Sequence, residues 1–269
     1  MQQGNKRAIR LYWQAIIVLA GLLLGGCAHS PTYDPYDPYE SVNRDFYAFN
    51  MTLDRYFLRP VAQGYERFTP DIVRQGVDNF LTNIFYPRTV INSFLQGKVV
   101  HGGQDVARFV VNTTVGLLGI FDVATPLGIP KHNEDFGQTL GHWGLGSGAY
   151  LMLPLLGPST TRDFSGRIVD WAFQPTTYMD AGPVFVITAL DIINVRAKLL
   201  KLDRTLQESF DPYTFLRGGY LQNRRSLVYD GKPPVQQDDY YPMGEDEASD
   251  IDAAFEEAME AADTDEPVQ

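Results

Sequence analysis

The sequence contains only one cysteine, Cys27, so the chain offers that residue no internal partner for a disulfide bond. Lysine and arginine are absent from Pro233 onward, where 13 aspartate and glutamate residues gather. Residues 1–232 hold 22 basic and 20 acidic groups and are nearly neutral, although the whole chain has a formal charge of −11. Proteins that bind nucleic acid present basic patches, so nucleic acid is not an expected partner.

The chain also lacks the motifs of common enzyme classes. Ser147 is flanked by glycines, but Leu145 breaks the Gly-x-Ser-x-Gly pattern of a nucleophile elbow. His132 stands near Glu134 and Asp135, yet residues at these spacings are poorly placed to share one metal ion. We therefore interpret this charged segment as a surface loop. The sequence predicts no catalytic residue, no metal site and no cofactor.

The first 26 residues have the features of a secretion signal. Basic residues between positions 6 and 10 precede an apolar run at residues 11–24, which is short for a membrane span. Leu24-Gly25-Gly26 before Cys27 resembles a bacterial lipoprotein cleavage site, which implies that Cys27 is lipidated. Ala28, and not aspartate, follows the cysteine, which implies sorting to the periplasmic face of the outer membrane.

Apolar residues at helical spacing dominate the mature chain and predict an all-α fold. Residues 39–56 form one amphipathic pattern, which we expect to end near Arg59-Pro60. Further helices are predicted from Pro70 with a break at Pro87, after Gly102-Gly103, from Phe164 to Pro175, from Pro183 as the longest helix, and after Asp211-Pro212. No alternating strand pattern is evident.

These patterns divide the mature chain into three parts. Residues 27–37 form a lipidated tether, and residues 38–232 form one helical domain. Residues 233–269 are predicted to be disordered, because acidic segments with few aromatic residues bury too little surface to fold. An alternative for residues 250–262 is a short amphipathic helix that docks on a partner.

Two apolar stretches are interrupted by glycine and proline. The stretch from Phe136 to Asp163 has no charged residue before Arg162, and residues 115–130 carry one charge, at Asp122. An irregular backbone is tolerated at membrane depth only where protein covers it or where it lines a cavity. With the polar residues 131–135 between them, the stretches fit either a re-entrant hairpin or two core segments joined by a surface loop.

A series of motifs is similar to those of the MlaA (VacJ) family of outer-membrane lipoproteins, over most of the mature domain. The most specific begins at Phe136-Gly137-Gln138-Thr139-Leu140-Gly141 and continues through Leu153-Pro154 and Gly157-Pro158 to Arg162-Asp163. The others are Asp37-Pro38-Tyr39-Glu40, Asn43-Arg44, Tyr47-Ala48-Phe49-Asn50, Arg59-Pro60-Val61-Ala62, residues 92–97, residues 108–113, Asp211-Pro212-Tyr213 and Arg217.

The resemblance implies a ring of amphipathic helices that lies in the periplasmic leaflet of the outer membrane around a central amphipathic channel. It also implies a function, namely the removal of mislocalised phospholipid from the outer leaflet and its transfer to a soluble, MlaC-like periplasmic carrier. Trimeric porins are the implied partners in the membrane. The direction of transport rests on this resemblance alone.

A phospholipid needs a polar path for its headgroup and an apolar path for its acyl chains. The uncharged stretch after Phe136 offers side chains of both kinds, so we predict that it lines the channel. The predicted lining residues are Gln138, Thr139, Leu140, His142, Trp143, Ser147 and Leu151, and the predicted flanking residues are Tyr47, Phe49, Asn50 and Leu53.

Two other functions compete with lipid transport. A structural lipoprotein that docks on porins would tolerate changes in the predicted lining but not in its porin-facing surface. A lipid hydrolase would use Ser147 or a histidine and release free fatty acid. The missing nucleophile elbow disfavours the hydrolase, and the two broken apolar stretches disfavour a mere scaffold.

Overall fold

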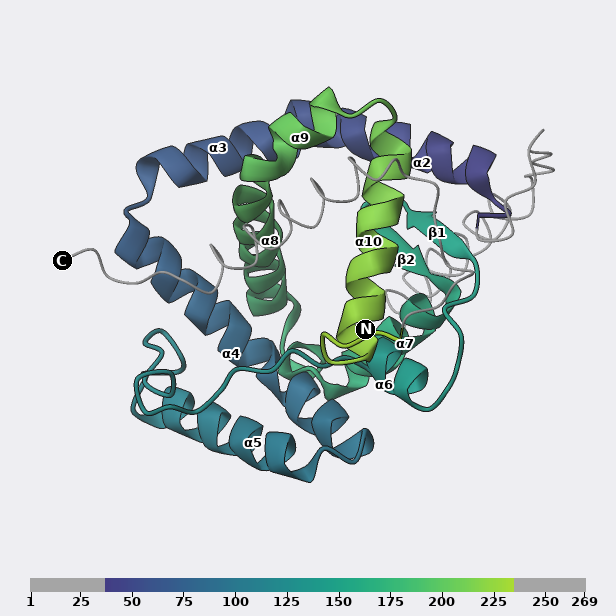
Figure 1. Ribbon diagram of the computed structural model, residues 1–269. Coiled ribbons are helices and arrows are strands. Elements are labelled where there is room, and N and C mark those ends of the chain that lie inside the picture. The colour runs from purple at the N-terminus through teal and green to yellow at the C-terminus, as the bar shows by residue number, and fades with distance from the viewer. Residues whose placement is uncertain (1–36, 235–269) are drawn as a thin grey trace, which may run out of the picture.

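A computed structural model describes residues 37–234, which form a framework of helices (Figure 1). The chain runs along one edge through α2 and α3, turns back through α4 and reverses again into α5. Helices α8 and α10 run between the edge that carries α2, α3 and α9 and the opposite edge near α6 (Figure 1). The helices are α2 (Glu40–Leu53), α3 (Arg59–Phe68), α4 (Asp71–Leu95), α5 (Val99–Thr114), α6 (Phe136–His142), α7 (Thr161–Phe173), α8 (Ala181–Lys198), α9 (Asp203–Glu208) and α10 (Pro212–Val228).

The first predicted helix does not end near Arg59-Pro60. A π-helical turn, Asp54–Leu58, joins α2 to α3 without a break, and Pro60 lies in the first turn of α3. The Arg59 N–H donates to the carbonyl of Asp54, five residues back. This wider turn directly before Pro60 accommodates a residue that lacks an N–H, so the proline does not stop the helix.

Pro87 does not break its helix either. Helix α4 continues through Pro87 and is 25 residues long in all. It is therefore longer than α8, which has 18 residues and which the sequence predicts to be the longest helix. Beside Pro87, Tyr86 and Thr89 are buried, and the Tyr86 hydroxyl donates to Asp105 over 2.8 Å. Tertiary contacts thus hold the helix together across a residue that local propensity disfavours.

The structure also contains one β-hairpin that the sequence pattern did not reveal. Strands β1 (Tyr150–Leu153) and β2 (Gly157–Thr160) pair antiparallel, with Leu153 opposite Gly157. β1 is only four residues long and entirely apolar, so it has no alternation to detect.

Burial in this domain is inverted relative to an ordinary globular protein. Within residues 37–234, polar and charged residues outnumber apolar ones among the buried side chains. Many large apolar side chains are exposed, including Phe57, Phe68, Ile72, Phe185 and Phe210. Soluble proteins rarely expose contiguous apolar surface on this scale. Among the described helices, none is long and apolar enough to cross a membrane.

Candidate functional site

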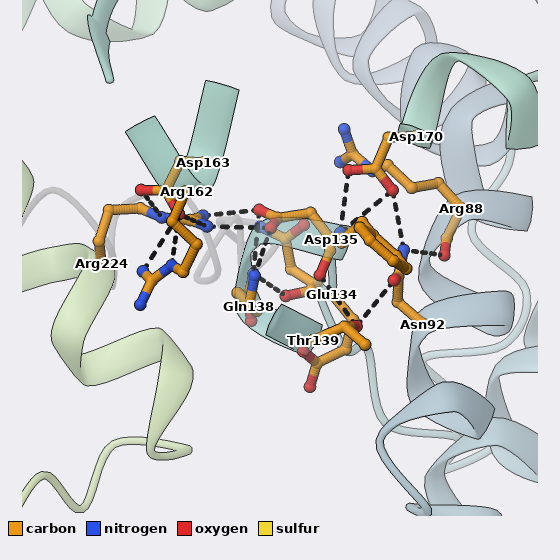
Figure 2. A network of polar contacts seen from close by, with 12 residues as sticks. Arg88, Asn92, Glu134, Asp135, Gln138, Thr139, Arg162, Asp163, Asp170 and Arg224 are labelled. Carbon is orange, nitrogen blue, oxygen red and sulfur yellow. Dashed lines mark hydrogen bonds and ion pairs between the residues drawn. The ribbon is translucent and has the colours of Figure 1, made fainter. Parts of the chain in front are cut away.

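The buried charges converge on α6, at the start of the uncharged stretch (Figure 2). Asp135 is the N-cap of α6 and accepts a hydrogen bond from the Gln138 backbone N–H over 2.8 Å. The Arg224 guanidinium on α10 donates to both Asp135 oxygens, over 2.6 and 2.9 Å. Burial acts to raise the pKa of Asp135, but these hydrogen bonds outweigh it and hold the pKa well below its usual range.

The same arginine bridges to a second carboxylate. Arg224 donates to Asp163 over 3.0 and 3.1 Å, and Asp163 also accepts from Arg162 and from the Tyr220 hydroxyl. Burial acts to raise the pKa of Asp163, but the charges of Arg224 and Arg162 lower it overall. One guanidinium therefore joins the starts of α6 and α7 to α10.

On its other side, α6 is joined to α4 and α7. Asp170 accepts from the Asn92 side chain over 2.9 Å and from the Phe136 backbone N–H. The Thr139 hydroxyl donates to the Asn92 side-chain oxygen over 2.7 Å. Helices α6 and α7 also approach so closely that a Cβ atom at Gly166 would lie 2.3 Å from the Gly137 nitrogen. Short α6 is thus held rigidly from several sides.

The charged segment before α6 is a surface loop only in part, because Lys131 and Asn133 are exposed but the other residues are buried or partly buried. Glu134 is buried and accepts hydrogen bonds from Gln96 and Lys98, over 2.8 and 2.9 Å. His132 lies within 2.8 Å of buried Asp105 and stacks on His101, with the ring centroids 4.2 Å apart. Glu134 and His132, which sequence reasoning placed in solvent, therefore belong to the polar interior.

Apolar side chains surround this interior on the outside. Two leucines in the loop after α5, Leu117 and Leu118, are 60% and 63% exposed. Both have left-handed backbone conformations, with φ of 53° and 61°, which are costly for leucine. Leu155, at the turn of the hairpin, combines the same features. The fold thus tolerates strain while it leaves these side chains outside.

Comparison with known proteins assigns this chain to a family. The family model described as MlaA lipoprotein matches residues 35–227. This chain belongs to the MlaA lipoprotein family. Escherichia coli MlaA, named an intermembrane phospholipid transport system lipoprotein, is 37% identical over 245 residues, which cover 88% of this chain and 97% of that protein.

The chain is also similar to two further proteins. A Rickettsia bellii protein described as uncharacterized is 39% identical over 196 residues, covering 72% of this chain and 77% of the relative. A solved structure from work on the maintenance of bacterial outer-membrane lipid asymmetry matches with a TM-score of 0.66 and 35% identity. The match covers 71% of this chain and 98% of that chain.

The predicted channel-lining residues fall into two groups in this MlaA-family chain. Gln138 and Thr139 are buried, and their side chains are occupied by hydrogen bonds within the interior network. The others are exposed or partly exposed: Leu140, His142, Trp143, Ser147 and Leu151. Trp143 donates through Nε1 to the Leu95 carbonyl over 3.1 Å and leaves more than half of its surface exposed. Only the second group is free to meet a ligand.

The predicted flanking residues lie on α2, beside the hairpin. The Asn50 side chain donates to the Leu153 carbonyl over 2.9 Å and accepts from the Leu155 N–H over 2.8 Å. Tyr47 packs edge-on against Tyr213, and Leu53 is partly exposed. Phe49 is half-exposed.

Asn43 completes this arrangement, and sequence reasoning missed its role. Asn43 appears in the sequence analysis only as part of a family motif. Asn43 lies seven residues before Asn50 on α2, donates to the Tyr150 carbonyl over 3.1 Å and accepts from the Met152 N–H over 2.8 Å. The two asparagines therefore bind backbone groups of β1 and of the turn that follows it. Their spacing of two helical turns is the signal that could have revealed this role.

We expect Asn43→Ala to destabilise the domain by about 3 kcal/mol, because it leaves buried backbone groups of Tyr150 and Met152 without partners. It also removes the 2.7 Å hydrogen bond to Asp37. Denaturation of the detergent-solubilised protein measures the change. Asn79→Ala is the control, because Asn79 makes one exposed 3.3 Å bond. Equal midpoints for the two variants would contradict this role of Asn43.

Proposed function

We propose that this chain is an outer-membrane lipoprotein that removes mislocalised phospholipids from the outer leaflet and passes them to a periplasmic lipid carrier. In doing so it maintains the lipid asymmetry of the outer membrane. Membership of the MlaA family supports this function, since curated members are named as phospholipid transport lipoproteins. The protein is a transporter and not an enzyme.

The observation that carries the proposal is the inverted burial of residues 37–234. An apolar exterior is stable only against lipid or another apolar surface, and a polar interior can accept a headgroup that lipid cannot solvate. We therefore place the domain in the periplasmic leaflet, with its helices around an amphipathic channel. The acyl chains on Cys27, which lies outside the described residues, provide the anchor.

Two partners follow from this position. A soluble carrier of the MlaC kind receives the phospholipid on the periplasmic side. Trimeric porins meet the apolar outer surface within the membrane. The exposed leucines and aromatic residues of the α5 loop and of α8 supply contact surface for porin or lipid.

The partly exposed residues of the uncharged stretch form the lining of the proposed channel. Leu140, Trp143 and Leu151 provide apolar surface for acyl chains, and His142 and Ser147 provide polar contacts. Gln138 and Thr139 act from behind this surface, because their hydrogen bonds fix α6. On α2, Phe49 and Leu53 flank the passage, and Asn50 and Tyr47 contact the hairpin beside it.

The deciding experiment labels surface-exposed phospholipid amines on intact cells with a membrane-impermeant reagent. We expect labelling to rise when the protein is absent and to return to normal when the wild-type chain is restored. A chain with Trp143→Asp should fail to restore it, because the charge opposes passage of acyl chains. Lys201→Asp, at an exposed polar position, is the control.

The alternative is a structural lipoprotein that associates with porins and does not move lipid. In that case labelling would not change on loss of the protein, although the envelope would weaken. Free fatty acid release that depends on Ser147 would instead indicate a hydrolase.

A further inference from the structure

A stacked pair of histidines joins α5 to the segment that leads into α6. The His101 ring, on α5, lies against the His132 ring, with the ring centroids 4.2 Å apart and the planes inclined by 15°. The loop that carries the exposed leucines, residues 115–131, separates the end of α5 from His132. The stack therefore ties the far end of this loop back to α5.

His132 is also bound to a carboxylate that is fully buried. Its Nδ1 atom lies 2.8 Å from Oδ1 of Asp105, which also accepts from the Tyr86 and Ser93 hydroxyls, over 2.8 and 2.7 Å. A carboxylate only accepts hydrogen bonds, so Nδ1 carries the proton and Nε2 of the neutral ring can gain a second one. Within residues 37–234, no lysine or arginine is hydrogen-bonded to Asp105.

The other ionisable groups around the pair come from α4, α5, the loop after α5 and the segment itself. They are the Tyr86 hydroxyl, Arg108, Asp122 and Lys131, which line one cleft, and Glu134 with its partner Lys98. Burial, and then the hydrogen bond to Asp105, raise the pKa of Tyr86, so its hydroxyl stays protonated. Histidine is the side chain whose charge ordinarily changes between pH 5 and 8. Acid in this range therefore acts on the two rings.

Protonation of both rings opposes the stack. A free histidine gains its proton near pH 6.5, and the charge of Asp105 can balance one imidazolium. Two imidazolium rings with centroids 4.2 Å apart repel each other in a partly buried place. The stacked state therefore binds one proton fewer than the separated state. Because the separated state binds more protons, the stability of the stack falls as the pH falls.

We propose that His101 and His132 form an acid-sensitive clasp, which holds residues 131–133 on α5 at neutral pH and releases them near pH 5. The release is local. Asp105 keeps its hydrogen bonds from Tyr86 and Ser93, and Glu134 stays paired with Lys98 over 2.9 Å. Acid thus loosens one end of the exposed leucine loop while the rest of the domain stays folded. The clasp acts in this way whether or not the protein moves lipid.

Amide hydrogen exchange in the full-length, lipidated protein, solubilised in detergent, tests the clasp. The His132 backbone N–H is a direct reporter, because it donates to the Tyr86 hydroxyl over 3.3 Å. Exchange at pH 7.5 and at pH 5.0 is expressed as protection relative to the unfolded chain at the same pH, which removes the intrinsic effect of pH. We expect the protection of residues 131–133 to fall on the order of tenfold at pH 5.0. One proton taken up about 1.5 pH units below pH 6.5 shifts an equilibrium by roughly 30-fold at most.

Two variants remove the charge from His101. His101→Phe keeps an aromatic ring against His132 but cannot be protonated, so its protection should be equal at the two pH values. His101→Gln should behave in the same way, and it separates the effect of charge from that of phenylalanine packing. His142→Phe is the matched control, because His142 lies at the other end of α6, and it should keep the wild-type response.

Three results would overturn the clasp. Equal protection of wild-type residues 131–133 at both pH values would show that acid does not release them. A fall of the wild-type size in both His101 variants would assign the response to other groups. A loss of the helical circular dichroism signal of the wild type at pH 5.0 would show general acid unfolding in place of a local release.

Discussion

Arg224→Met is expected to destabilise the domain by about 3–5 kcal/mol, because it leaves two largely buried carboxylates without their shared cation. Asp135 and Asp163 each receive two hydrogen bonds from Arg224, all between 2.6 and 3.1 Å. For a domain of about 200 residues, this loss lowers the thermal midpoint by about 10 °C. Thermal unfolding of the detergent-solubilised protein, followed by circular dichroism, measures it.

The effect of Arg224→Met should also depend on pH. The pKa values of Asp135 and Asp163 are depressed in the folded state, so their contribution to stability is present above the unfolded pKa of about 4. It is lost as the pH falls toward the folded values. The difference in thermal midpoint between wild type and variant should therefore be largest near pH 7 and should become smaller below pH 4.

The control for this prediction is Arg204→Met, because the Arg204 side chain is 85% exposed and pairs with Glu208 in solvent. Its midpoint should match the wild type, since exposed ion pairs contribute little. A midpoint for Arg224→Met that also matches the wild type would show that the network is not needed for the fold.

The helices of this domain could be predicted from sequence, but the direction in which they face could not. In α5, apolar residues at helical spacing such as Val106 and Val110 mark one face, and this face is exposed. The polar face, which contains Asp105, Arg108 and Asn112, is buried against the rest of the protein. Periodicity separates the two faces of a helix, and only the surroundings decide which face is inward.

The interior network could not be predicted from the sequence, for a different reason. Asp135 and Arg224 are 89 residues apart, and the sequence around either residue does not indicate that the other is its partner. Local signals did exist for single members. Asp135 directly precedes the apolar start of α6, and Thr160 stands three residues before Asp163, both of which are N-terminal helix signals. Charges near an uncharged stretch were assigned to solvent because that is their usual place in soluble proteins.

A second large effect is expected on the binding of the protein to lipid when the acyl anchor on Cys27 is absent. In a chain with Cys27→Ser, the exposed apolar surface should still hold the protein on phospholipid vesicles. Replacing both Leu117 and Leu118 with aspartate should weaken this binding by on the order of 1000-fold. Each buried leucine contributes about 2 kcal/mol, and each carboxylate adds a desolvation cost.

The loop itself should survive this double substitution. Its shape is held by hydrogen bonds from Asn83 to the Leu118 carbonyl and from the Gly119 N–H to Asn112, which use no leucine side chain. Aspartate also tolerates the left-handed conformation better than leucine does. Folding and vesicle binding can therefore be measured independently in the same variant.

A control variant with Gln63→Asp and Gln207→Asp adds the same charge at exposed polar positions and removes no apolar surface. Sedimentation with vesicles at several salt concentrations compares the two variants, because salt screens the added charges but leaves the apolar contribution. Equal weakening in both would mean that net charge, and not the leucine loop, governs attachment. Weakening confined to the leucine variant would place the loop after α5 within the lipid.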